Sequence, residues 1–298
     1  MPASPTALPD LAEVSEWYRS DARDLPWRRT DFHRTYAAWG TLVSEFMLQQ
    51  TPVARVIPHL DAWLRRWPTP TAMAAASPAE VVTQWANLGY PRRALWLHGA
   101  ALAVAERHDG VVPRDVTQLL ALPGIGDYTA RAVAVFAYGD RHPVVDTNTR
   151  RVLARVIDGT AQPGPPSRRD LETMQRLLPD EDAESALFNA AVMELGAVIC
   201  TARAPKCEQC PISGSCRWFA LGRPIGEDTR RRQAKYEGSD RQARGAVLRM
   251  LRQTHGDGVA LEDVIPDWPD SAQRHRAIDS LIVDGLAEAA DGMLSLPR

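Results

Sequence analysis

The only cysteines of this 298-residue chain lie within one stretch of seventeen residues, at Cys200, Cys207, Cys210 and Cys216. Thiols gathered so closely suit a metal centre, because a metal neutralises the repulsion between neighbouring thiolates. Four cysteines can hold either an iron–sulfur cluster or zinc. The spacing C-x6-C-x2-C-x5-C contains one C-x2-C pair, whereas structural zinc sites usually have two such pairs. The spacing alone therefore leaves both an iron–sulfur cluster and zinc as alternatives. Two disulfides are the weakest alternative in a reducing compartment.

Two carboxylates stand out by their positions in the helical pattern. Glu45, in SEFMLQQ, lies about 120° from the apolar stripe that carries Trp39 and Phe46 on its predicted helix. Most such glutamates are merely solvated. Asp146, in PVVDTNTRRVL, comes just before another predicted helix, where aspartate is a good cap. The helix start would also keep its carboxylate ionised, which suits the stabilisation of a developing positive charge.

A glycine-rich turn joins two helical patterns in LLALPGIGDYTARAVAVFAYG, residues 119–139. The first helix is predicted to end at Leu122, and the second to begin near Asp127. Gly124 and Gly126 would let the backbone come close to a ligand, and the free N–H groups of the second helix would suit a DNA phosphate. A plain corner between two core helices is the alternative interpretation.

Charge and hydropathy narrow the class of protein only partly. The chain holds 35 Lys+Arg and 37 Asp+Glu, a formal net charge of −2, so bulk charge does not indicate a nucleic-acid binder. Its only lysines are Lys206 and Lys235. The N-terminus has no signal-peptide pattern, and no apolar run approaches the about 20 residues of a membrane span. We therefore expect a cytoplasmic protein with no membrane partner, long enough for two domains.

The elements around these residues are predicted to be mainly helical, since apolar residues recur at helical spacing through most of the chain. Residues 222–240 are polar and Arg-rich and are predicted to form a linker. After two further helical patterns, LAEAADGMLSLP alternates around Asp291–Gly292, which indicates a hairpin. This order predicts a winged-helix module over residues 241–298; a mere packing cap is the alternative.

Several motifs together resemble one family of DNA-repair enzymes. LPGIGDYTA, the aspartate that follows it and the cysteine spacing resemble the helix–hairpin–helix DNA glycosylases that hold a four-iron cluster. SEFMLQQTPVARV, LPWR, LGYPRRA and MELGAVICTARAPKCEQCP are similar to the adenine DNA glycosylases of the MutY type. The resemblance covers about residues 15–220. It implies a mainly α fold with an iron–sulfur cluster domain (1–28 and 140–221) and a six-helix barrel domain that carries the helix–hairpin–helix (29–139). The linker (222–240) and the winged-helix-like module (241–298) predicted from the residues would follow these two domains.

The resemblance also implies a reaction. The family flips an adenine, paired with 8-oxoguanine or guanine, out of double-stranded DNA and hydrolyses its N-glycosidic bond. Glu45 would protonate the adenine on its five-membered ring, and Asp146 would stabilise the oxocarbenium-like sugar. Tyr128 and Asn148 match positions that align these carboxylates and the sugar. The four cysteines would then hold a [4Fe–4S] cluster.

The DNA-contacting residues that we expect lie in four segments. Those that would wedge into the opened base stack are Gln50, Leu88 and Tyr90. Arg28 would line the pocket for the base, and Gly124 and Gly126 would meet the phosphate backbone. The expected partner is mismatched duplex DNA, with the protein acting as a monomer on the nucleoid.

The sequence departs from the family pattern at two places. Ala190 stands where the family often has Glu or Gln in contact with the adenine, and residues 241–298 are too short for the Nudix-like domain that many members carry. Bifunctional relatives similar to endonuclease III place a lysine where this chain has Tyr128, and residues 1–205 contain no lysine for a Schiff base. We therefore predict a monofunctional adenine glycosylase, over an endonuclease III-like glycosylase/lyase or a non-catalytic DNA-binding protein.

Overall fold

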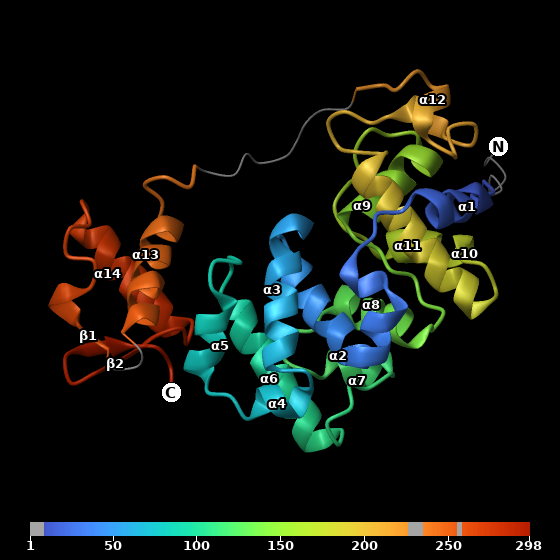
Figure 1. The fold of residues 1–298 in the computed structure, drawn as a ribbon. Coiled ribbons are helices and arrows are strands. Elements are labelled where there is room, and N and C mark those ends of the chain that lie inside the picture. Colours follow the sequence, from blue (N-terminus) through green and yellow to red (C-terminus); the bar gives the residue numbers. More distant parts are fainter. Residues whose placement is uncertain (1–8, 226–234, 255–257) are drawn as a thin grey trace. The chain divides into compact units, whose positions relative to one another are not determined.

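The computed structural model describes residues 9–225, 235–254 and 258–298, and this part of the chain is mainly helical (Figure 1). The described chain divides into two compact units. Unit 1 comprises residues 9–41, 114–120 and 125–225, and unit 2 comprises residues 42–113, 121–124, 235–254 and 258–298. Helix α2 (Thr30–Leu48) contributes residues to both units and contains one non-helical residue, Ala37. The domain boundaries expected from the sequence stay a prediction.

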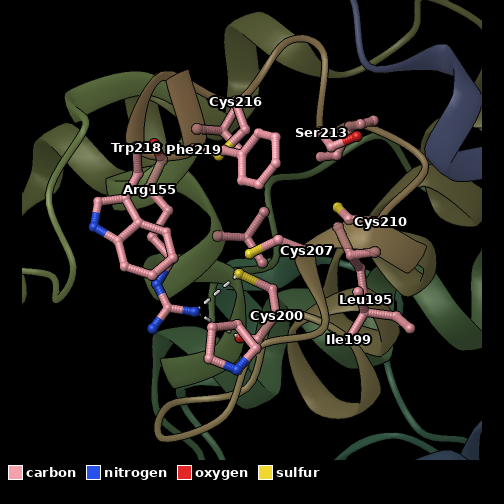
Figure 2. Close-up of a pocket in the computed structure, with 14 residues that line it drawn as sticks. Arg155, Leu195, Ile199, Cys200, Cys207, Cys210, Ser213, Cys216, Trp218 and Phe219 are labelled. Carbon is pink, nitrogen blue, oxygen red and sulfur yellow. Dashed lines mark hydrogen bonds between the residues drawn. The ribbon is translucent and has the colours of Figure 1, made fainter. Parts of the chain in front are cut away.

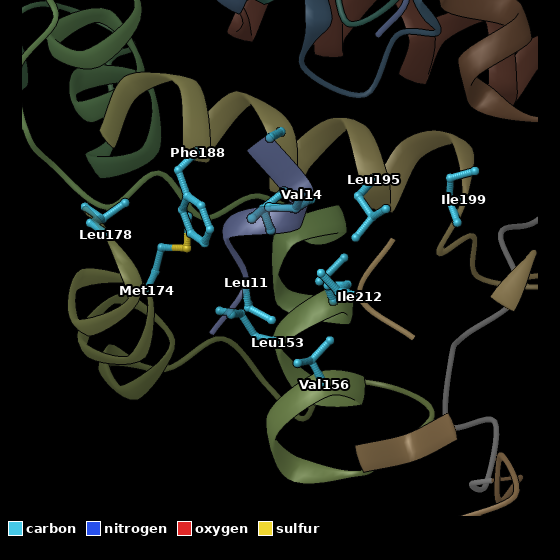
Figure 3. Packing of buried hydrophobic residues seen from close by; sticks show 13 residues of the cluster. Leu11, Val14, Leu153, Val156, Met174, Leu178, Phe188, Leu195, Ile199 and Ile212 are labelled. Carbon is cyan, nitrogen blue, oxygen red and sulfur yellow. The ribbon is translucent and has the colours of Figure 1, made fainter. Parts of the chain in front are cut away.

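Unit 1 is built from short helices around one apolar core. Its helices besides α2 are α1 (Ala12–Asp21), α7 (Val116–Leu120), α8 (Asp127–Tyr138), α9 (Thr147–Leu153), α10 (Arg168–Leu177), α11 (Asp182–Val198) and α12 (Arg217–Ala220), with single turns at Pro26–Arg28, Ala154–Asp158 and Cys207–Gln209. Helix α11 packs against α1 and α9. Phe188 and Leu195 of α11, and Ile199 just after this helix, line this core together with Val14 and Leu153 (Figure 3). The fully buried stripe explains why α11 stays helical along seventeen residues.

Unit 2 contains α3 (Val53–Arg66), α4 (Pro70–Ala74), α5 (Pro78–Trp85), α6 (Arg92–Arg107) and the C-terminal module. Helix α6 packs on α4 and α5. The rings of Trp63 and Trp85 meet edge to face at 5.5 Å and fill the interior. Ser77 and Glu80 form a reciprocal capping box that fixes the start of α5.

The helix–turn–helix predicted around residue 124 is present, with a shifted boundary. Helix α7 ends at Leu120 rather than at Leu122, because the turn already begins at Ala121, and α8 begins at Asp127 as expected. Gly124 has φ +73°, and a Cβ there would come within 2.5 Å of Trp96 Cβ. Glycine is therefore needed at this turn for both backbone and steric reasons.

The C-terminal module has the element order of a winged helix. Helix α13 (Asp240–Gln253), β1 (Val259–Ala260), α14 (Ser271–Val283), β2 (Glu288–Ala290) and β3 (Met293–Ser295) follow one another, and the antiparallel sheet has the order β1-β3-β2. The hairpin turns at Asp291 and Gly292, both with positive φ, as the sequence indicates. Its core includes Val82 of α5 and is packed by Leu95 of α6, so the module has a packing role in unit 2.

Part of the predicted linker, residues 226–234, lies outside the described residues. Among the helices that are described, none combines the length and the apolar character needed to cross a bilayer.

Candidate functional site

The four cysteines surround one pocket in unit 1 (Figure 2). All four are free thiols, so the disulfide alternative is wrong. The other pocket walls are mostly apolar and include Leu195, Ile199 and Ile212. In the part of the chain that the structure describes, no three potential ligands converge tightly enough for a single metal ion. Four thiols around an apolar pocket, rather than around a point, fit a multi-atom iron–sulfur cluster.

Burial disfavours the thiolate form of these cysteines. It raises the pKa of Cys210 to about 11 and also raises the pKa of Cys216, so binding of a metal centre here would have to release protons from both thiols. The buried guanidinium of Arg155 donates to Cys200 Sγ at 3.2 Å (Figure 2). It also donates to the Thr201 carbonyl at 2.8 Å. Arg155 also stacks on Trp218, 4.4 Å from the ring centroid. It thereby holds both ends of the cysteine-bearing segment 200–216 in place.

Asp146 caps α9, as the sequence predicts. Its Oδ1 accepts the Thr149 N–H at 2.7 Å, and its Oδ2 accepts Asn148 Nδ2 at 2.8 Å. Asn148 Oδ1 in turn accepts from Arg151 Nη2 at 2.8 Å. Arg151 also donates to the carbonyls of Gly196 and Cys200. Asp146 and Asn148 are thus brought together, and each has a defined orientation.

Tyr128 lies on the first turn of α8, half-buried, and packs against a small apolar cluster that includes Val144. The fully buried Asn189 accepts the Val144 N–H at 2.8 Å and donates to the His142 carbonyl at 3.0 Å. This side chain fixes the extended segment that leads into Asp146. The next residue, Ala190, is half-buried on α11.

Arg28 belongs to an ion cluster around the buried carboxylate of Glu194 in unit 1. Its Nη2 donates to Glu194 at 2.8 Å, Arg23 grips the same carboxylate at 2.6 Å, and the Arg28 guanidinium stacks on Tyr18 at 5.1 Å. Burial alone would raise the pKa of Glu194, but the hydrogen bonds from Arg23 and Arg28 outweigh it and hold the pKa at about 2. Arg28 is therefore rigidly held; its contact with a base stays a prediction.

Glu45 lies in the unit 2 part of α2 and is only 6% exposed. The interpretation that it is merely solvated is therefore wrong, because neighbouring segments cover this face of the helix. Gln50, just beyond α2, is exposed, and Tyr90 is 46% exposed. Leu88 is only 2% exposed, so its insertion into DNA would require it to leave the core.

The two hairpin glycines differ in their surroundings. Gly124 packs against Trp96 and belongs to unit 2. Gly126 precedes α8 in unit 1, is exposed, and a Cβ there would meet nothing within 4 Å. The protein itself therefore does not require glycine at 126, which leaves the space beside it open to a ligand.

Comparison with known proteins assigns these features to one family. A family model described as HhH-GPD superfamily base excision DNA repair protein matches residues 43–175, and the iron-sulfur binding domain of endonuclease III matches residues 200–216. An adenine DNA glycosylase of Mycolicibacterium smegmatis is 53% identical over 285 residues, which cover 95% of this chain and 94% of that protein. The chain belongs to the adenine DNA glycosylase family. The adenine DNA glycosylase of Homo sapiens is 43% identical over 224 residues, 70% of this chain and 40% of its own length.

Structural similarity agrees with this assignment. A thermostable thymine-DNA glycosylase superposes with a TM-score of 0.63 at 28% identity, covering 70% of this chain and 94% of that one. The predicted helix–hairpin–helix glycosylase fold with an iron–sulfur domain is thus confirmed. The protein is an adenine DNA glycosylase of base excision repair, and the non-catalytic alternative is wrong.

The match at residues 200–216 decides between the two metals left open by the spacing. It supports a [4Fe–4S] cluster at the four cysteines, and the zinc alternative is wrong. The apolar walls would keep water from the cluster, and the N–H···S bond from Arg155 would withdraw charge from the Cys200 sulfur.

We expect the purified glycosylase to be yellow-brown and to contain about four irons per chain. Replacing Cys207, the most buried of the four thiols, by serine should lower iron content and destabilise unit 1, because a cluster ligand is lost from the pocket. Metal analysis and the blue absorbance of the wild type and this variant give the measurement. One zinc and no iron in the wild type would contradict the assignment.

Sequence reasoning missed several residues that hold this site. Glu194, Asn189, Arg151 and Gly196 act through contacts with segments far along the chain. A Cβ on Gly196 would lie 2.8 Å from Asn148 Cβ, so this glycine lets α11 approach α9. The only available signal was the run MELGAVIC, in which a charged residue and a glycine interrupt an otherwise apolar helix.

Proposed function

We propose that this glycosylase removes adenine paired with 8-oxoguanine or guanine, and that it hydrolyses the glycosidic bond without cutting the strand. One observation carries the monofunctional assignment: Tyr128 occupies the first turn of α8, and residues 1–205 contain no lysine. A lyase step requires an amine that forms a Schiff base with the sugar, and no side chain of this region supplies one. The family assignment and the motif SEFMLQQTPVARV support the mismatched adenine as substrate.

In this proposal Glu45 is the general acid. Its burial supports the role, because a carboxyl group shielded from bulk water can pass its proton directly to a base bound beside it. Protonation of the adenine ring lets the bond between the sugar carbon and the base nitrogen break, and the bonding electrons leave with the adenine. A positive charge then develops on the sugar.

Asp146 stabilises that charge in the second part of the proposal. Its two oxygens each accept one hydrogen bond, from the Thr149 N–H and from Asn148, and these donors hold the carboxylate in a fixed orientation. Water then adds to the sugar carbon and releases its proton, which leaves an abasic site. Tyr128 helps to shape the site around the sugar, and it supplies no amine for a Schiff base.

Contacts with DNA in this proposal come from exposed groups. Gln50 and Tyr90 are exposed, and the open space beside Gly126 suits a phosphate at the start of α8. Arg28 would line the base pocket from its position over Tyr18. We further propose that the enzyme acts as a monomer on nucleoid DNA in the cytoplasm, with the C-terminal module adding phosphate contacts.

We expect adenine excision from A:8-oxoguanine and A:G duplexes, and strand scission only after added alkali or an abasic-site nuclease. The measurement is gel analysis of the products with and without alkali, with an A:T duplex as the control. Borohydride trapping should give no substantial protein–DNA adduct. Scission without alkali, together with efficient trapping, would contradict the monofunctional proposal and favour a glycosylase/lyase.

A further inference from the structure

Arg93, near the start of α6, is buried and makes an unusual set of hydrogen bonds within unit 2. It is 3% exposed, yet no carboxylate pairs with it in the described chain. Its guanidinium donates instead to one hydroxyl and four carbonyl oxygens, namely Phe46 (2.7 Å), Met47 (3.1 Å), Gln49 (2.6 Å), Thr51 Oγ1 (2.9 Å) and Gly89 (2.9 Å). Burial lowers its pKa only to about 10, so it stays charged at neutral pH.

These acceptors belong to two segments that are separate in sequence. The carbonyls of Phe46, Met47 and Gln49 lie at the C-terminal end of α2, where helix carbonyls lack partners and a cation is favoured. Gly89 lies in the loop between α5 and α6. Thr51 reinforces the link, because its hydroxyl accepts from Arg93 and reaches the Leu88 carbonyl at 3.3 Å.

Both segments have backbone conformations that need outside support. Gln50, Ala86 and Tyr90 have φ values of 54°, 48° and 47°, in the region that side chains other than glycine rarely adopt. The Arg93 guanidinium also faces the rings of Trp85 (5.0 Å) and Tyr90 (5.6 Å). One buried cation thus joins the segment that bears Gln50 to the loop that bears Tyr90.

We propose that Arg93 is a positioning residue for the opening of the duplex: with Thr51 as its partner, it fixes Gln50 and Tyr90 relative to each other so that they engage the base stack together. This inference rests on the proposed DNA contacts of Gln50 and Tyr90. Arg93 itself is too buried to touch DNA. Its two terminal nitrogens, Nη1 and Nη2, hold four N–H groups in one plane and reach all five acceptors, while Nε–H has no partner among the described residues. The three donors of a lysine, all on one nitrogen, cannot span the same acceptors.

Thr51→Val provides the first test, because valine keeps the shape and removes the hydroxyl. The probe is a duplex with an uncleavable 2′-fluoro adenosine opposite 8-oxoguanine or guanine and a 2-aminopurine beside it, whose fluorescence rises on unstacking. We expect Thr51→Val to lower both this signal at saturating protein and single-turnover excision, by about tenfold. Thr51→Ser, which keeps the hydroxyl, should stay within about twofold.

Arg93→Lys should give a larger loss of both signals, with KM for the duplex little changed. Arg66→Lys is the matched control, since it makes the same change at the surface of unit 2, where Arg66 stacks on Trp67 and pairs with Glu80; it should leave both signals unaltered. Normal duplex opening by Thr51→Val and Arg93→Lys, or equal impairment of Thr51→Val and Thr51→Ser, would overturn the inference. Failure of the proposed chemistry alone would appear differently, as normal opening without excision by the wild type.

Discussion

Glu45→Gln should lower the single-turnover rate of adenine excision by roughly 10³-fold or more, the largest effect that we expect from any substitution. Glutamine matches glutamate in shape but cannot give a proton to the adenine ring. Because Glu45 is buried on α2, no bulk-water proton donor replaces it easily. Affinity for the mismatched duplex should change little, since the amide keeps the volume of the side chain. Excision under single-turnover conditions and equilibrium binding to an uncleavable duplex measure the two quantities.

Glu106→Gln is the matched control for this experiment. It makes the same change on the exposed side of α6 in the same unit and should leave the rate of excision unaltered. A Glu45→Gln enzyme that excises adenine at the wild-type rate would remove Glu45 from the mechanism. If Glu45→Gln lost duplex binding together with excision, the Glu45 side chain would instead have a structural role in unit 2.

Asp146→Asn should lower the excision rate by about 10²- to 10³-fold, while the thermal stability stays close to that of the wild type. Asparagine caps a helix about as well as aspartate does, so the hydrogen bond from the Thr149 N–H should persist. The negative charge that would stabilise the sugar cation is lost. Excision rates and thermal unfolding of the same preparations separate these two roles.

Asp115→Asn offers a close control, because Asp115 accepts the Gln118 N–H at 3.0 Å at the start of α7 in the same unit. It makes the same chemical change at a helix start with the same kind of bond. We expect its excision rate to equal that of the wild type. If the Asp146→Asn enzyme were fully active, the prediction would be wrong and Asp146 would act only as a helix cap.

Features encoded by neighbours along the chain could be predicted from the sequence. The cysteine spacing indicated a metal centre, and the position of Asp146 before TNTRRVL indicated a cap that the hydrogen bond to Thr149 confirms. The glycines around residue 125 indicated the turn between α7 and α8, and Asp291–Gly292 indicated the hairpin between β2 and β3. Each of these features depends on the backbone conformation or the ligand spacing within a few residues. The local sequence determines both directly.

Tertiary packing alone decided which polar side chains are buried and what they contact. Glu45 has the pattern of a solvated glutamate but is buried, and Leu88 is in the core although its motif suggested a wedge. Glu194 meets Arg23 and Arg28 from more than 160 residues away, and Arg93 reaches back to the end of α2. These contacts form only after apolar burial has brought distant segments together, and the low dielectric then makes each unsatisfied group costly. Periodicity reports which face of a helix is apolar, but it does not report which segment will cover the polar one.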